Sequence, residues 1–284
     1  MCTLSWLHTR SGLELFFNRD ESLTRPDAQL PVVEDHGDIS TLMPTDPVGG
    51  GTWIAANSQG MVVALLNNYR YPSTVPPDKA ISRGMLVKRL GKVRDIAEVR
   101  KFLSAETLFF YPPFFLLAFQ GENRGPYQWE WDGETLKETW NPPGSSLSTS
   151  SLMPRLIPGL RNFLVNRLIK KARKQGCPDQ TAPELLALHR SCRPWPASLA
   201  IAMRRKGRAT VSLTHIKVTS GQLTFRYWPG HPTDTAHEKP FETRLKLNGS
   251  CSTPKESVGS HDSAVTNARQ GCPCSIGPIF GPSP

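Results

Sequence analysis

The chain has 284 residues and a formal net charge of +10, with 38% hydrophobic and 20% charged residues. This composition is typical of globular proteins and excludes fibrous and fully disordered classes. No stretch approaches the roughly 18 consecutive apolar residues of a membrane-spanning helix, and the N-terminus lacks the basic and apolar regions of a secretory signal. We therefore expect a cytoplasmic protein without a transmembrane segment.

Six cysteines occur without a CxxC pair or a regular spacing, and the histidines show no metal-ligand spacing. We expect neither a disulfide framework nor a metal, and no cofactor is implied by these residues.

The first seventy residues predict β-structure. "CTLSWLH" (residues 2–8) and "LELFFN" (13–18) flank a turn-like "TRSG", which indicates a hairpin that starts at the chain terminus. "TWIAAN" (52–57) and "MVVALLNN" (61–68) predict a second hairpin. The two hairpins frame a polar segment.

Two helices are expected next. Ser82 can cap a helix over residues 83–90, and Asp95 can cap one over 96–103, where apolar residues recur at helical spacing. Three strands follow, with Asp132-Gly133 as a hairpin turn. They are "FFLLAF" (114–119), "YQWEWDG" (127–133) and "TLKETW" (135–140).

The second half begins with a Pro/Gly/Ser-rich segment, residues 141–151. An amphipathic helix is then predicted over residues 157–176, and a shorter one over 184–191 that opens at Thr181 and Pro183. The apolar side of the longer helix is assigned Ile157, Leu160, Phe163, Leu164 and Leu168. Residues 210–218 and 222–228 predict a last hairpin around Ser220-Gly221.

The composition changes after about Gly230, where Ser, Pro and Gly dominate and periodicity fades. We expect a domain over residues 1–230 and a disordered tail over 231–284. Cys272 and Cys274 in this tail lack the further ligands of a metal site. Because strands and helices come in blocks, the fold class is predicted as α+β.

The positive charge is concentrated in one segment. Residues 155–208 hold 13 Lys and Arg against Asp179 and Glu184, and the rest of the chain is nearly balanced. The segment lacks interleaved aromatic residues and nucleic-acid-binding signatures, so nucleic acid is not an expected partner. A solvated basic face and a surface for an anionic ligand or partner remain the two interpretations.

Cys2 directly follows the initiator methionine. Methionine is normally removed before a small residue, which would leave a first residue carrying both a thiol and a free α-amine. The reference pKa values of these groups, about 8.5 and 7.7 to 8.0, allow the amine to act as the base of the thiol. The alternative is a small residue that starts a buried strand.

The stretch "NRDE" at residues 18–21 ends the strand expected to pair with the N-terminal strand, so it would lie beside Cys2. Arg19 could hold the thiolate or a substrate carboxylate, and Asp20 or Glu21 could orient the α-ammonium. An exposed salt-bridged turn is the alternative interpretation. "GGGTW" (49–53) lacks the Lys and Ser/Thr of a phosphate-binding loop, so its glycines indicate a tight turn.

Seven short motifs in chain order resemble the NRDE family, which includes the transport and Golgi organisation protein 2 of eukaryotes. The resemblance covers roughly the first 230 residues. Its motifs are Met1-Cys2-Thr3, residues 18–21, Arg25-Pro26, residues 50–53, Leu66-Asn67-Asn68, Ser82-Arg83-Gly84 and Thr210-Val211-Ser212.

The family is similar to N-terminal-nucleophile hydrolases of the penicillin V acylase and bile salt hydrolase kind. The resemblance therefore implies a four-layer αββα sandwich with Cys2 as the nucleophile. The expected catalytic residues are Cys2, Arg19, Asp20 and Asn68, with the amide of Asn67 or Asn68 as the oxyanion donor. The expected substrate-binding residues are Asn18, Glu21, Trp53, Asn67 and Arg83.

Three functions are consistent with these residues. The first is an amidohydrolase that cleaves the C–N bond of a small acylated amine. The second is a binding or trafficking protein that handles haem or lipid on the same fold without catalysis. The third is an anion-binding adaptor that uses the basic segment.

Overall fold

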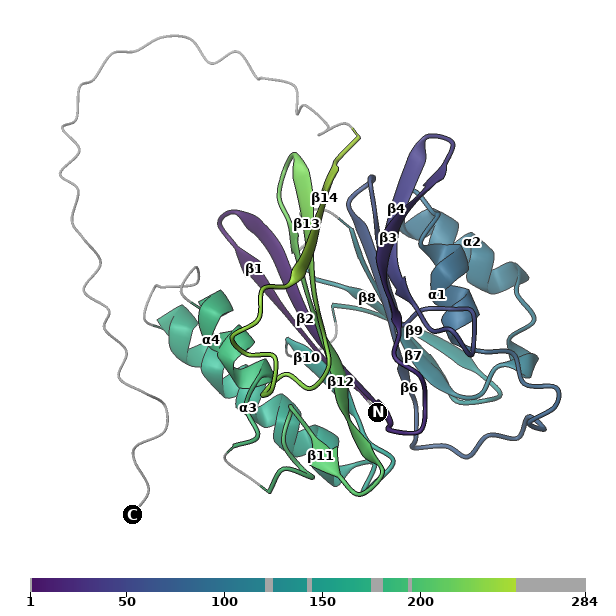
Figure 1. Ribbon diagram of the computed structural model, residues 1–284. Coiled ribbons are helices and arrows are strands. Elements are labelled where there is room, and N and C mark those ends of the chain that lie inside the picture. Colours follow the sequence, from purple (N-terminus) through teal and green to yellow (C-terminus); the bar gives the residue numbers. More distant parts are fainter. Residues whose placement is uncertain (1, 121–124, 142–144, 175–180, 194–195, 249–284) are drawn as a thin grey trace, which may run out of the picture.

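The structure is a computed structural model of the chain. It describes residues 2–120, 125–141, 145–174, 181–193 and 196–248. Two seven-stranded antiparallel sheets face each other, and a pair of helices covers the outer face of each sheet (Figure 1). The predicted α+β class and the four-layer αββα sandwich are confirmed. No helix among these residues combines the length and the apolarity needed to cross a bilayer.

The first sheet carries the N-terminus in its interior. Its strand order is β10 (Ser146–Thr149), β1 (Cys2–Thr9), β2 (Gly12–Ser22), β12 (Arg208–Val218), β13 (Gln222–Pro229) and β14 (Phe241–Lys246), with β11 (Arg204–Arg205) paired to β12. β1 is therefore hydrogen-bonded on both sides. Its first six residues are buried, because one face of the strand packs on the second sheet and the other on helices.

The second sheet is a meander in chain order. It contains β3 (Gln29–His36), β4 (Ile39–Thr45), β5 (Ile54–Asn57), β6 (Met61–Asn67), β7 (Phe114–Gln120), β8 (Tyr127–Trp131) and β9 (Leu136–Trp140). A central core fills the space between the two sheets, where Leu4 and Phe17 meet Leu66 and Phe115. Alternate residues of β6 and β7 face outward instead and pack on the helices.

Helices close both outer faces. α1 (Gly84–Leu90), α2 (Ile96–Ala105) and the short 3-10 helix η1 (Leu108–Phe110) lie on the second sheet, and α3 (Leu156–Lys174) and α4 (Thr181–His189) lie on the first. Asp95 caps α2 as predicted, because its side chain accepts from the backbone N–H of Glu98 at 2.9 Å. Ser82 does not cap α1. Arg83 occupies the N-cap position, without a side-chain cap bond.

Three segments differ from the sequence-based expectation. The polar segment between the predicted hairpins forms the β3–β4 hairpin, which alternation did not reveal because β3 exposes Leu30, Val32 and Val33. The Pro/Gly/Ser-rich segment contains β10, which pairs with β1. The sandwich also continues beyond Gly230, because β14 pairs with β13. The remaining tail, including Cys272 and Cys274, lies outside the described residues.

The continuation beyond Gly230 predicts a stability difference between two truncated chains. Leu245 on β14 is 7% exposed and packs in the central core. A chain ending at Gly230 loses this burial and is expected to be at least about 2 kcal/mol less stable than a chain ending at Asn248. Urea unfolding of both chains measures the difference. Equal unfolding free energies would show that β14 contributes nothing to the core.

Candidate active site

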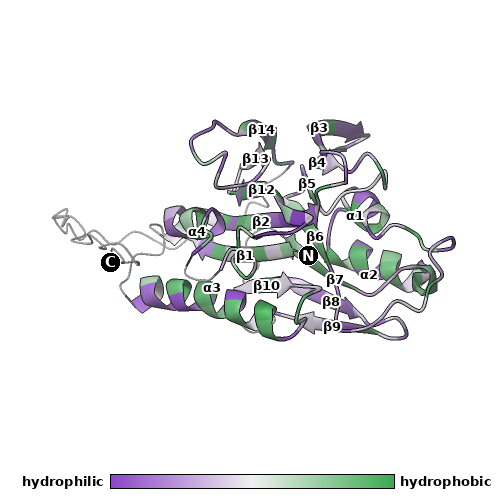
Figure 2. Cartoon of the chain, turned by 60° about the horizontal axis from the view of Figure 1, so that its bottom comes forward, coloured by the Kyte–Doolittle hydropathy of each residue, from purple (hydrophilic) through white to green (hydrophobic). Residues whose placement is uncertain are grey.

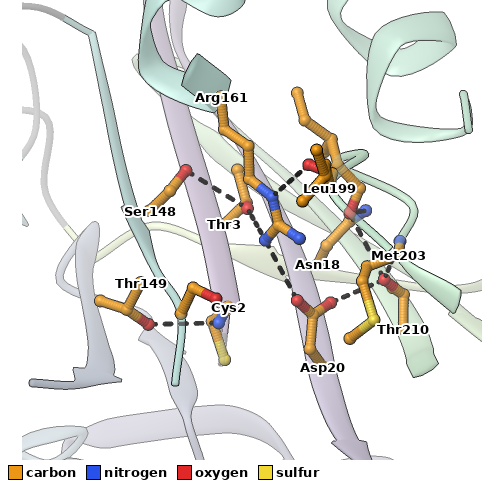
Figure 3. Close-up of polar contacts among 12 residues, drawn as sticks. Cys2, Thr3, Asn18, Asp20, Ser148, Thr149, Arg161, Leu199, Met203 and Thr210 are labelled. Atoms are coloured by element: carbon orange, nitrogen blue, oxygen red, sulfur yellow. Dashed lines mark hydrogen bonds and ion pairs between the residues drawn. The ribbon is translucent and has the colours of Figure 1, made fainter. Parts of the chain in front are cut away.

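Cys2 is the first residue of an interior strand. In the sheet register it lies opposite Thr149 of β10 on one side and Arg19 of β2 on the other. Its backbone N–H donates to Thr149 Oγ1 at 3.3 Å (Figure 3). The residue is 8% exposed and belongs to the edge of the central core. The terminus is thus held at a fixed position where the two sheets end.

The groups around the Cys2 thiol shift its pKa in opposite directions. Burial raises its pKa above the ordinary value, and the charge of Asp20 acts in the same direction. The positive charge of the N-terminus, a hydrogen bond with the Asp20 backbone and the charge of Arg19 lower the pKa, but the net effect is a raised value. The thiol is therefore protonated near neutral pH and needs a base to become a nucleophile.

A cavity of about 290 Å³ opens at Cys2. Seven of the predicted site residues line it, together with loop residues from both sheets. They are Cys2, Arg19, Asp20, Glu21, Trp53, Asn67 and Arg83. The N-terminal strand, the last three residues of the NRDE tetrad and the motifs at residues 25–26, 50–53, 66–68 and 82–84 therefore meet in one place.

Gly51 and Gly84 line one side of this cavity. Gly50 has φ +63°, so the turn before β5 uses a conformation that favours glycine. A Cβ atom on Gly51 would overlap the backbone of Gly84, and the Thr52 N–H donates to the Gly84 carbonyl at 3.1 Å. The "GGGTW" and "SRG" motifs thus bring two backbones into contact, which confirms the tight turn expected from the glycines.

Charged side chains form a network around the opening. Arg19 Nη2 lies 3.5 Å from Glu21 Oε2 and 3.9 Å from Asp46 Oδ2, and its guanidinium stacks 4.3 Å from the ring centre of Trp53. Arg25 binds Asp46 through two nitrogen atoms, at 3.2 and 2.5 Å. Asp46 therefore links both arginines, and this pairing holds the pKa of its carboxyl below the ordinary value although burial opposes it.

Asp20 faces the helical layer rather than Arg19. Its carboxylate accepts from Arg161 Nη1 of α3 at 3.2 Å and from Thr210 Oγ1 of β12 at 2.6 Å (Figure 3). Arg161 also donates to Thr3 Oγ1 and to the Leu199 carbonyl. Both charged side chains are at most 1% exposed. From the helical side of the sheet, Arg161 thus holds Thr3 and Asp20, which follow Cys2 and Arg19 along their strands.

Sequence reasoning missed Arg161, although a signal for it existed. Arg161 is one of the basic residues of the segment 155–208, but it follows Ile157 by four positions and precedes Val165 by four. Those two side chains are buried, so Arg161 lies on the same buried face of α3. Phe163 was assigned to this face and is instead 59% exposed. Asp46 and Thr149 were also not predicted.

Asn18 does not line the cavity, which corrects its assignment as a substrate-binding residue. It alternates with Arg19 along β2 and points to the helices, where its Nδ2 donates to the carbonyls of His189 and Ile201. Its Oδ1 accepts from His189 Nδ1 at 2.9 Å, and His189 Nε2 accepts from Ser5 Oγ at 2.7 Å. Asn18 anchors α4 to the sheet.

Asn68 is also placed away from the cavity and is not the amide expected at the site. Its Nδ2 donates to Glu130 Oε1 at 3.1 Å, and its Oδ1 accepts from the backbone N–H of Arg70. Asn67 lines the cavity instead, and its Nδ2 donates to the Tyr69 hydroxyl at 3.1 Å. Neighbouring residues at the end of a strand point to opposite sides, and the sequence left this choice open.

Solved structures of known proteins share this fold. A cysteine-to-alanine mutant of conjugated bile acid hydrolase from Clostridium perfringens is 13% identical, with a TM-score of 0.54 over 87% of this chain and 92% of that one. The N-acylethanolamine-hydrolyzing acid amidase ortholog of Caenorhabditis elegans is 11% identical, with a TM-score of 0.52 over 87% of this chain and 100% of that one. The fold is that of the N-terminal-nucleophile hydrolases.

Comparison of the sequence with models of protein families shows which family the chain belongs to. The model of the Transport and Golgi organisation 2 family matches residues 1–226, and the chain belongs to this family. No curated protein matches the sequence significantly.

The buried ion pair predicts strong coupling between Asp20 and Arg161. Removing one partner leaves a buried charge unpaired, so Arg161→Met and Asp20→Asn are each expected to cost about 3–5 kcal/mol of unfolding free energy. The double variant should lose much less than the sum of the two. Urea unfolding of the four chains measures the coupling. The exposed pair Arg204–Asp234 is the matched control, with an expected coupling below about 1 kcal/mol. Additive losses at Asp20 and Arg161 would contradict the pairing.

His189 predicts a pH dependence of stability. Burial lowers its pKa to about 3. Below about pH 6.5 the unfolded chain therefore binds a proton that the folded chain excludes, and stability falls by about 1.4 kcal/mol per pH unit as far as the folded pKa. Between about pH 7 and pH 5 this residue alone should account for a loss of about 2 kcal/mol in urea unfolding. His189→Gln should reduce the pH dependence by that amount; an unchanged dependence would exclude His189 as its source.

Proposed function

We propose that the protein is an N-terminal-nucleophile amidohydrolase that cleaves the C–N bond of a small acylated amine, with Cys2 as the nucleophile after removal of Met1. The observation that carries this proposal is the position of Cys2, which starts an interior strand and lines a cavity together with Arg19 and Asn67. The hydrolytic activities in the names of the bile acid hydrolase and the acid amidase support the reaction class.

The proposed reaction begins with proton transfer within Cys2. Removal of Met1 converts the backbone N–H that now bonds to Thr149 Oγ1 into an α-amine. The amine takes the thiol proton, and the thiolate attacks the carbonyl carbon of the substrate. The ammonium then returns the proton to the departing nitrogen as the C–N bond breaks. A thioester remains, and water attacks it with the α-amine again as the base.

Arg19 and Asn67 have separate roles in this scheme. The Arg19 guanidinium lowers the pKa of the Cys2 thiol, which partly offsets the effect of burial. Asn67 replaces Asn68 as the proposed amide donor to the oxyanion, because it lines the cavity. Asp20 positions the strand through Arg161 and does not touch the substrate.

A second candidate function uses the cavity at Cys2 without catalysis. In a chain that keeps Met1 the α-amine is absent from Cys2, and the thiol stays protonated at neutral pH. The same cavity would then serve a binding or trafficking protein for haem or lipid. Whether Met1 is removed distinguishes the two candidate functions.

The proposal predicts how fast Cys2 is alkylated. A chain that starts at Cys2 should react with iodoacetamide at least about tenfold faster near pH 7 than a chain in which tag cleavage leaves Gly before Met1, because each unit of thiol pKa changes the thiolate fraction tenfold. Peptide mapping against time gives both rates. Cys192, whose pKa is also raised by burial, is the internal reference. Equal rates for the two chains would exclude a nucleophile activated by its own amine.

Charge around the cavity indicates an anionic group on the substrate. Arg19 and Arg25 are paired with Glu21 and Asp46. Arg83 donates to the Pro113 carbonyl at 3.0 Å, and no ion pair of Arg83 occurs within the described ranges. Burial lowers the pKa of Arg83, although the charge of Glu21 beyond ion-pair distance acts in the opposite direction. We propose that Arg83 binds a carboxylate or a similar anion of the substrate.

The role of Arg83 is tested with two alkylating reagents of equal size and different charge. Arg83→Met should lower the rate of Cys2 alkylation by iodoacetate roughly tenfold relative to iodoacetamide, since it removes one favourable charge interaction. Arg83→Lys keeps the charge and is the control. If both reagents slow down equally, Arg83 stabilises the thiolate and does not select anionic substrates.

A further inference from the structure

The outer face of α3 and the turn before it expose large apolar side chains. Leu152, Met153, Leu156 and Phe163 are 40%, 55%, 57% and 59% exposed, and we call them the apolar group. Leu156 and Phe163 are seven residues apart, so they lie on one side of the helix. The opposite side of α3 packs on the first sheet. Exposed apolar residues gathered in this way mark interaction surfaces more often than scattered ones do.

Cationic side chains flank the apolar group, one directly before α3 and four in the C-terminal half of the helix. Arg155, Arg167, Lys170, Lys171 and Lys174 are exposed, and we call them the basic group. α3 contains no acidic residue. None of the five forms an ion pair with any residue that the structure describes. Phe163 lines one groove together with four members of the basic group, so the two groups are contiguous. Figure 2 shows that α3 carries both hydrophobic and hydrophilic positions along its length.

The combination of both groups fits one kind of surface. Apolar side chains beside unpaired lysines and arginines are what an anionic bilayer binds, because the apolar groups enter the headgroup boundary while the cations contact lipid phosphates. A single aromatic residue, Phe163, offers little for stacking nucleic-acid bases. We propose that the α3 face, made of the apolar and basic groups, docks the protein on anionic phospholipid membranes.

The position of this face relates it to the candidate active site. Met153 and Leu156 line a groove together with Tyr69 and Arg70. The Tyr69 hydroxyl accepts from Asn67, which lines the cavity of Cys2. A docked α3 face therefore brings the bilayer near the mouth of the cavity. The docking proposal stands on the α3 face alone and does not depend on catalysis.

Vesicle sedimentation of the full chain tests the proposal. The chain should bind vesicles of equimolar phosphatidylcholine and phosphatidylserine, and bind vesicles of phosphatidylcholine alone much more weakly. Lys170→Gln with Lys171→Gln should weaken binding about 25-fold, since each charge contributes about fivefold. Phe163→Ser should weaken binding about tenfold and leave its salt dependence unchanged. Thermal unfolding midpoints confirm that the variants are folded.

Matched variants on the opposite helical layer are the control. Lys92→Gln with Lys101→Gln removes two exposed charges beside and within α2, and Phe109→Ser removes an apolar residue that is 64% exposed in η1. These variants should bind vesicles like the unchanged chain. Equal binding to both vesicle types, or equal losses in the control variants, would overturn the proposal. Self-association that Phe163→Ser abolishes, or RNA binding that displaces the vesicles, would assign the face to another partner.

Discussion

The position of β1 in the interior of the first sheet constrains everything else in the structure. A terminal strand commonly lies at an edge, where it can fray, but here Cys2 has strand partners on both sides, in Thr149 and Arg19. The strand is buried on both faces, so its first residues pack as tightly as the middle of the core. This arrangement holds a thiol at the end of the chain in a fixed place, which is the condition for a nucleophile that carries its own base.

Charge is distributed around this strand in two layers. On the helical side, the Arg161–Asp20 pair and Thr3 form a buried network that links α3 to β1 and β2. On the cavity side, Asp46 joins Arg19 and Arg25, whereas Arg83 forms no ion pair with any residue that the structure describes. The inner layer is neutral, and the outer layer has one positive charge to offer a ligand.

Periodicity predicted most strands and helices from the sequence, because the strands near the site are strongly apolar and their turns carry clear signals. The hairpin pattern also predicted that Arg19, Asp20 and Glu21 lie beside Cys2, whereas the placement of Trp53 and Arg83 at the same site came from the family resemblance. The β3–β4 hairpin and β10 were not, since their pairing depends on neighbours that only the folded chain provides. Side-chain direction at Asn18 and Asn68 was equally inaccessible, because a shift by one residue exchanges the two faces of a strand.

Mass spectrometry of the chain after brief incubation with a panel of N-acyl-4-nitroanilides tests the central claim most directly. The account predicts release of 4-nitroaniline together with an acyl adduct on the peptide that begins with Cys2. The adduct should persist in Cys192→Ala and be absent in Cys2→Ala. Release of 4-nitroaniline that survives Cys2→Ala, or an acylated chain in which Cys2 carries no adduct, would contradict a nucleophile at the N-terminus.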